Sequence, residues 1–179
     1  NNFGGVTMIN VSMVTPTLEE LSAFDSILVY SIDPYKDAKS LGNVVSEYAL
    51  SGGGVVTASH ESNTHSLQGE WIKQKLNVYE HDDNYKEAKH SLGNVLIEGH
   101  PILAKVESFK GNSLHARKKN PLNGKIVSKW TDGSPLVTIR NGNEKIVDLS
   151  FWPVSDKAHD LGYFSGWDSS TDGWQLIAN

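Results

Sequence analysis

The sequence predicts an α/β domain in which a parallel strand–helix–strand unit is followed by antiparallel strands. Two apolar runs of strand length flank a segment whose apolar residues repeat with the period of a helix. In the C-terminal third, strand-like runs are separated by Asp132-Gly133 and Asn141-Gly142, dipeptides that two-residue hairpin turns prefer. A helical connection favours parallel strands, whereas a short turn requires antiparallel ones. We therefore expect a parallel sheet core with an antiparallel hairpin extension.

The N-terminal region predicts a strand, a short helix and a second strand. The run 6–11 (VTMINV) is rich in β-branched residues and has strand length. Thr17 is a helix-capping residue type, and Glu19 and Glu20 would occupy the first turn, where the helix dipole favours carboxylates. The apolar run 26–31 (SILVYS) is of the type that is buried on both faces of a sheet.

The clearest helix carries apolar residues at positions 41, 44, 45, 48 and 49, which form one stripe along a helix. The glycine triplet at 52–54 follows it and supplies the backbone freedom that a helix end favours. A second buried-looking strand, 55–58, comes next. This order of elements is a βαβ unit, so the strands at 26–31 and 55–58 are expected to lie parallel.

Between this unit and the hairpins the pattern is weaker. The expected elements there are a helix at 67–76, a polar loop at 81–90 and a short strand at 95–97. The later elements are strands at 125–130, 136–140 and 145–151 and a helix capped by 170–173. The pentapeptide SLGNV occurs at 40–44 and again at 91–95, but the flanking residues do not match. Coincidence is therefore favoured over an internal duplication.

The composition excludes several classes of function. The chain has 179 residues, which suits a single domain over 1–179 with one sizeable core. Its net charge of -5 argues against nucleic acid as a partner, because binding to a polyanion needs a basic surface. No apolar run approaches the roughly 20 residues of a membrane-spanning helix. Cysteine is absent, which excludes disulfides, thiolate metal sites and a cysteine nucleophile.

A family resemblance covers most of the chain. Its motifs are TLEEL, FDSILVYS and LGNVVSEYALSGGGVVTAS across 18–59, GHPI at 99–102, DLSFWP at 148–153, and the end from TDG at 171–173 onward. This order resembles the class I glutamine amidotransferase-like superfamily, in particular its ThuA-like branch and bacterial extracellular domains of that shape. The resemblance implies a three-layer, flavodoxin-like α/β sandwich. It also implies an earlier strand–helix unit, so we expect this chain to be a fragment of a longer one.

The same resemblance points to the residues that follow the strand 55–58. In active glutaminases of this class, that strand leads to the nucleophilic cysteine, so the absence of cysteine excludes glutamine hydrolysis by that route. Many ThuA-like proteins instead end the strand with a histidine. Here Ser59 stands at that position and His60 comes one residue later. Ser59, His60 and Glu61 are therefore the candidate pocket residues, at the strand ends where open parallel sheets bind ligands.

Two catalytic interpretations of this region compete with a solvated loop. A serine hydrolase would combine Ser59 with His100 or His159 and with Asp156, but the glycines of a nucleophile elbow are missing. A zinc motif would need two histidines four residues apart, whereas His60 and His65 are five apart. The pattern favours a solvated loop, with no catalytic residue, no metal and no cofactor.

The other histidines are expected to be structural. His100 precedes Pro101, where a histidine ring can hydrogen-bond the backbone of a turn. The remaining ones are expected in polar loops without the spacing of metal ligands; they are His81, His90, His115 and His159.

The late tryptophans and one asparagine are further candidate binding or modification sites. Trp152, Trp167 and Trp174 could stack against sugar rings if exposed, although packing in the core is the commoner role of tryptophan. Asn10 begins the single N-x-S/T sequence of the chain and is a candidate glycosylation site.

These observations predict a non-catalytic structural or interaction module of a larger, extracellular or cell-surface assembly. The expected partners are proteins, either other domains or copies of this chain. One alternative is a hydrolase acting on carbohydrates or small polar substrates at Ser59–Glu61. The other is a sugar-binding module that uses the late tryptophans.

Overall fold

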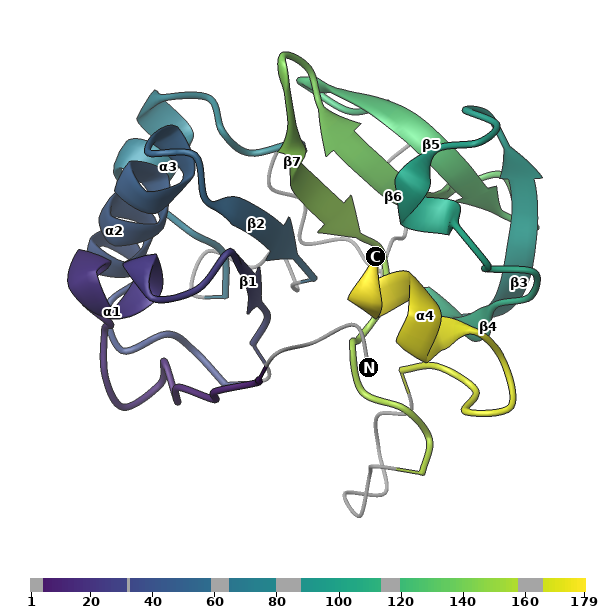
Figure 1. The fold of residues 1–179 in the computed structure, drawn as a ribbon, viewed down its shortest axis with the longest axis horizontal. Coiled ribbons are helices and arrows are strands. Elements are labelled where there is room, and N and C mark those ends of the chain that lie inside the picture. Colours follow the sequence, from purple (N-terminus) through teal and green to yellow (C-terminus); the bar gives the residue numbers. More distant parts are fainter. Residues whose placement is uncertain (1–4, 32, 59–64, 80–87, 114–119, 158–165) are drawn as a thin grey trace.

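The described residues form a mixed α/β fold around a curled seven-stranded sheet (Figure 1). The computed structural model describes residues 5–31, 33–58, 65–79, 88–113, 120–157 and 166–179. The helices are α1 (Leu18–Ser22), α2 (Ala38–Leu50), α3 (Glu70–Lys73), the 3-10 turn η1 (Pro101–Leu103) and α4 (Gly173–Ala178). The strands are β1 (Ser26–Val29), β2 (Gly54–Thr57), β3 (Ala88–Val95), β4 (Lys110–Ser113), β5 (Gly124–Trp130), β6 (Pro135–Arg140) and β7 (Asn143–Leu149).

The strand order is β1-β2-β7-β6-β5-β3-β4, and it overturns the expected three-layer flavodoxin-like sandwich with a parallel core. Among the described residues, β1–β2 and β2–β7 pair parallel, while the other four pairings are antiparallel. The physical reason is that α2 is the one long helix among these residues. A doubly wound parallel sheet needs a helical crossover for each parallel pair, with helices on both faces.

Two parts of the sequence prediction are confirmed locally. Strands β1 and β2 are parallel neighbours joined through α2, as the βαβ pattern predicts. The strands β5, β6 and β7 form the expected antiparallel meander, with Gly133 and Gly142 at positive φ in the two turns. Figure 1 shows α1, α2 and α3 gathered beside β1 and β2, while the meander curls toward β3 and β4.

Buried apolar residues form two clusters on opposite faces of the sheet. The cluster on the helix side contains Val45 and Tyr48 of α2 together with Val55 of β2 and Ile146 of β7. The other cluster holds Phe109 and the meander residues, including Trp130, whose ring centroid is 5.3 Å from that of Phe109. Because side chains alternate along a strand, β7 contributes Ile146 to one cluster and Val147 to the other.

The short helix α1 begins as expected, but the elements around it differ. Thr17 and Glu20 form a reciprocal capping box at the start of α1. The expected strand 6–11 is wrong: residues 5–10 have no regular structure, and a turn follows at Asn10, whose carbonyl accepts from Met13. Burial of the strand at 26–31 on both faces is also wrong, because Ser26 and Leu28 of β1 are exposed while Val29 is buried.

The middle of the chain departs most from expectation. The helix expected at 67–76 is limited to α3, Glu70–Lys73. Of the expected loop 81–90, residues 81–87 lie outside the described residues, and 88–90 begin β3. Of the short strand expected at 95–97, only Val95 belongs to a strand, as the last residue of β3, and residues 96–97 form a bend. The terminal helix is confirmed as α4.

Candidate binding site

The candidate site is built where a late segment covers the outer edge of β4. Gly111 of β4 forms an antiparallel bridge with Trp167, and Trp167 forms a parallel bridge with Ser155. The Asn112 N–H donates to the Gly166 carbonyl at 2.8 Å, and the Asp168 N–H donates to the Lys110 carbonyl at 2.9 Å. Two short segments from the C-terminal part of the chain thus extend the β3–β4 ladder.

Glycine at position 111 permits this close approach. A Cβ atom at Gly111 would lie 2.6 Å from the Gly166 carbonyl oxygen, which is shorter than real Cβ contacts. Because His90 pairs with Gly111, and Gly111 with Trp167, His90 and Trp167 occupy one row across the ladder. Side chains in the next row, which contains Ser91, Lys110 and Asp168, belong to the opposite face.

A hollow of about 300 Å³ lies at this ladder. The residues around it include lysines, aspartates, hydroxyl and amide residues and one tryptophan. Its lining residues are Lys89, His90, Ser91, Lys110, Gly111, Asn112, Thr131, Asp156, Gly166, Trp167 and Asp168. We call it the β3–β4 pocket. The two lysines and two aspartates give it nearly balanced charge.

Its two carboxylates are fixed by serines of the neighbouring turn. The Asp156 Oδ1 accepts from the Ser169 N–H at 3.0 Å, and the Asp168 Oδ1 accepts from Ser170 N–H and Oγ at 2.9 and 2.6 Å. Hydrogen bonds from Ser169 lower the pKa of Asp156, and those from Ser170 lower the pKa of Asp168. Both groups are therefore carboxylates at neutral pH.

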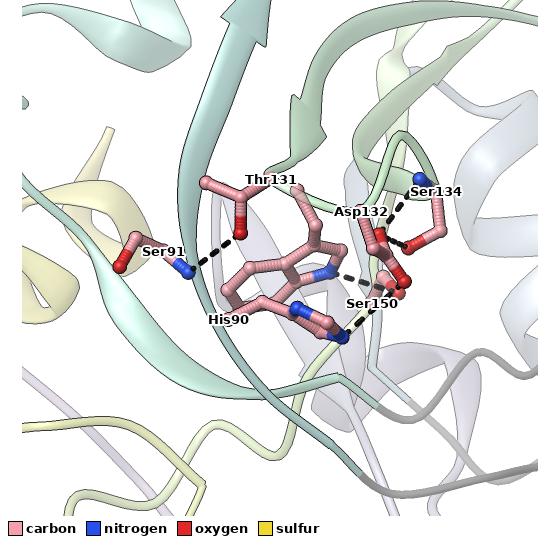
Figure 2. A network of polar contacts seen from close by, with 7 residues as sticks. His90, Ser91, Thr131, Asp132, Ser134 and Ser150 are labelled. Atoms are coloured by element: carbon pink, nitrogen blue, oxygen red, sulfur yellow. Dashed lines mark hydrogen bonds and ion pairs between the residues drawn. The ribbon is translucent and has the colours of Figure 1, made fainter.

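His90 joins the pocket to a polar network behind it (Figure 2). Its Nε2 lies 3.2 Å from Asp132 Oδ2, and Asp132 Oδ1 accepts from the Ser134 N–H and Oγ at 2.9 and 2.5 Å. Burial raises the pKa of Asp132, but the Ser134 hydrogen bonds and the nearby His90 outweigh it and leave that pKa below its ordinary value. The imidazole also lies 6.2 Å from the Trp130 ring, between centroids.

The same network ties β3 to the turn after β5. The Thr131 N–H donates to the Ser91 carbonyl at 3.0 Å, and the Ser91 N–H donates to Thr131 Oγ1 at 3.4 Å. A histidine oriented by a carboxylate is the arrangement of a general base, but it is equally a structural link when both groups serve to hold a turn. Here the Asp132 carboxylate is held by its own turn as well as by His90.

The candidate residues Ser59, His60 and Glu61 lie outside the described residues, as does His159. His100 is described, and its Nδ1 accepts from the Ile102 N–H at 3.2 Å at the start of η1, the expected role in a turn. Asp156 lines the β3–β4 pocket. The expectation that His90 lies in a polar loop is wrong, because it belongs to β3.

The three late tryptophans do not share an exposed surface. Trp152 and Trp167 are buried, and Trp174 on α4 is exposed. Trp167 nevertheless lines the β3–β4 pocket. Asn10 is exposed, and its Oδ1 accepts from the Ser12 N–H and Oγ at 3.1 and 2.7 Å, so its side chain stabilises a turn instead of facing a sheet.

A buried polar row on the helix side of the sheet was not predicted. Thr57, Asp148 and Thr138 are paired across β2, β7 and β6. The Thr57 hydroxyl donates to Asp148 Oδ2 at 2.9 Å, and the Tyr79 hydroxyl lies 2.6 Å from Thr138 Oγ1. Burial strongly raises the pKa of Tyr79. The sequence signal was the aspartate inside the otherwise apolar strand IVDLSF.

Comparison of the chain with protein-family models and with curated proteins finds no match. Within the described ranges, no three histidine, aspartate or glutamate side chains gather as a metal ion would require. Those ranges also contain no helix long and apolar enough to cross a membrane.

Proposed function

We propose that this domain is a non-catalytic interaction module and that the β3–β4 pocket takes a polar ligand of the carbohydrate type. The observation that carries the proposal is that Lys110, Asn112, Asp156, Asp168 and Trp167 all line this one pocket. These groups come from strand β4 and from the two late segments that extend its ladder.

The chemistry of the pocket fits a neutral polyhydroxy ligand better than a highly charged one. Each sugar hydroxyl can donate to a carboxylate and accept from an ammonium or amide group at the same time. Hydrogen bonds to charged partners are the stronger ones, and an indole edge offers apolar surface to a sugar ring. Because the lysines and aspartates nearly cancel, a polyanion or polycation gains little net attraction.

The arrangement around His90 supports binding in preference to catalysis. Its Nε2 is directed to Asp132, and Asp132 is held by Ser134 in the turn between β5 and β6. The pair therefore connects β3 to that turn, which stabilises one wall of the pocket. The chain also has no cysteine, so no thiolate nucleophile is available.

The test is a titration of ¹⁵N-labelled protein with neutral oligosaccharides up to about 10 mM, a range suited to weak single-site binding. We expect shifts confined to the pocket residues, including the Asn112 amide. Asp156→Asn combined with Asp168→Asn keeps an oxygen acceptor at both positions and removes both charges. It should weaken binding at least about tenfold, as expected when charge-assisted hydrogen bonds become neutral ones.

The control is Glu144→Gln, which replaces one carboxylate by an amide at an exposed position of β7 outside the pocket. It should leave the affinity unchanged. Shifts that lie outside the pocket, or equal affinity for the double variant and the parent, would contradict the proposed site. Turnover of an oligosaccharide abolished by His90→Ala would contradict the non-catalytic assignment.

A further inference from the structure

The N-terminal segment presents apolar side chains that the domain does not bury. Residues 1–17 contain no charged side chain. Within the described part of this segment, Val6 and Met8 are 72% and 88% exposed, and Met13 and Val14 are exposed as well. Flexible methionine side chains of this kind are common at protein-binding surfaces.

This segment has the composition of a strand but does not form one in the single chain. The run VTMINV at 6–11 combines high β-propensity with no charge, no proline and no glycine, a pattern typical of segments that pair with other chains. The segment is anchored at one end, where the Lys36 N–H donates to the Val11 carbonyl at 3.0 Å and Val11 packs against the helix-side core. Figure 1 shows residues 5–17 leading to α1 outside the sheet.

The second feature is the outer edge of β1. Among the described residues, no strand pairs with this edge, whereas the opposite edge strand β4 is covered by the segment around Trp167. The Asp25 and Val29 carbonyls accept from β2, so by alternation the N–H and C=O groups of Ser26 and Leu28 face outward. Natural proteins protect such edges with charges or proline, and β1 (SILV) has neither.

The apolar side chains of the N-terminal segment can also lie on the same face as the exposed apolar side chain of β1. Val29 belongs to the helix-side core and Ile27 packs against it, so Leu28 is on the opposite face, where it is 37% exposed. In an added strand, Val6 and Met8 would share one face, because side chains alternate. That face can lie beside Leu28 and extend the apolar surface there.

We propose that residues 6–10 of one copy add as a strand to the outer edge of β1 in a second copy, with Val6 and Met8 beside Leu28. Both halves of this contact are uncharged and present in every chain. The contact is head-to-tail, so each copy offers one segment and one edge, and repetition would produce rings or filaments. The partner is therefore another copy of this chain, independent of the β3–β4 pocket.

Sedimentation velocity from about 10 µM to about 1 mM tests this association in the range of weak interfaces. The average mass of the parent should rise with concentration. Met8→Lys should keep it at the mass of one chain, because the segment lies outside the core. Leu28→Pro should do the same by removing an outward N–H, a position where an edge strand tolerates proline. Leu122→Lys, which charges another exposed leucine, is the matched control and should associate like the parent.

The absence of native cysteine allows a direct test of the pairing. Oxidation of a mixture of Met8→Cys and Leu28→Cys chains should give mixed disulfide dimers at least about tenfold more than a mixture of Met8→Cys and Leu122→Cys, because disulfides require Cα atoms within about 7 Å. A parent that stays at the mass of one chain, or equal cross-linking in both mixtures, would overturn the proposal. A chain carrying both Met8→Cys and Leu28→Cys that closes a disulfide within itself would also overturn it, in favour of intramolecular pairing.

Discussion

Replacement of Gly42 by alanine tests how the segment before α3 crosses helix α2. In an exposed helix, alanine is favoured over glycine by about 1 kcal/mol. Here an added Cβ would lie 1.9 Å from the Gln68 carbonyl oxygen and 2.7 Å from its nitrogen. The Gln68 N–H donates to the Ala38 carbonyl at 3.0 Å, so this crossing segment cannot move away without losing a hydrogen bond.

Because of this clash, alanine at position 42 should be less favourable than glycine, the reverse of the ordinary helix preference. Reaching an ordinary contact of 3.4 Å requires Gln68 to move by more than an ångström. Overpacking of this kind costs about 1–3 kcal/mol, and backbone that is held at both ends lies at the upper end of that range. After subtraction of the propensity gain, we expect Gly42→Ala to lower the free energy of unfolding by about 2 kcal/mol.

Urea denaturation followed by circular dichroism measures this change. The midpoint should fall while the slope of free energy against urea stays constant, because the surface exposed on unfolding is nearly unchanged. Glu47→Ala, at an exposed position of the same helix, should change the free energy by no more than about 0.5 kcal/mol. A Gly42→Ala variant as stable as the parent, or more stable, would refute the described crossing.

Three further predictions concern the buried row, acid stability and Ser59. Tyr79→Phe should cost about 1–3 kcal/mol by leaving the Thr138 hydroxyl unsatisfied, and a double-mutant cycle with Thr138→Val should show coupling; additive losses would contradict the contact. Hydrogen bonds from Ser108 and Glu107 hold the pKa of Asp172 below its ordinary 3.8, so its stabilising effect is complete above that value and is lost as pH falls through the lowered pKa. Asp172→Asn should therefore flatten the unfolding free energy below about pH 4, and an unchanged acid profile would argue against this role. A fluorophosphonate probe should leave Ser59 unlabelled by mass spectrometry; labelling there would identify a serine nucleophile.

The elements that the sequence predicts well are those set by local pattern. The βαβ unit and the meander follow from apolar periodicity and from turn dipeptides, which act over a few residues. The position of β7 between β2 and β6 could not be predicted, because Val55 and Ile146 pair across 91 positions of sequence. That pairing depends on which apolar faces meet, and the flavodoxin-like expectation failed at this point.

The pentapeptide SLGNV shows the limit of local information in one molecule. Its first copy lies in helix α2, where Leu41 is buried and Val44 packs against the helix-side core. Its second copy lies in strand β3, where Gly93 approaches the Trp130 carbonyl. The same five residues therefore adopt both structures, and their packing partners decide between them.

The β3–β4 pocket could not be predicted from the sequence for a related reason. His90 and Asp132 come from a strand and a distant turn, and Trp167 reaches β4 through a bridge to Gly111. The sequence identified Trp167 and Asp156 only as separate candidates. Glycines at 111 and 166 were a signal of close backbone approach, but they do not indicate which strands approach each other.

The place of β7 in the sheet has a consequence for the order of events during synthesis. Strands β1 and β2 are synthesised before β7. The edge of β2 that pairs with β7 therefore has no partner until about 90 more residues have been added. Until then, the βαβ unit exposes the unpaired edge of β2 and the apolar residues that later pack beside β7. A ribosome-stalled chain ending before residue 143 should therefore be far more sensitive to protease than one extended past 149.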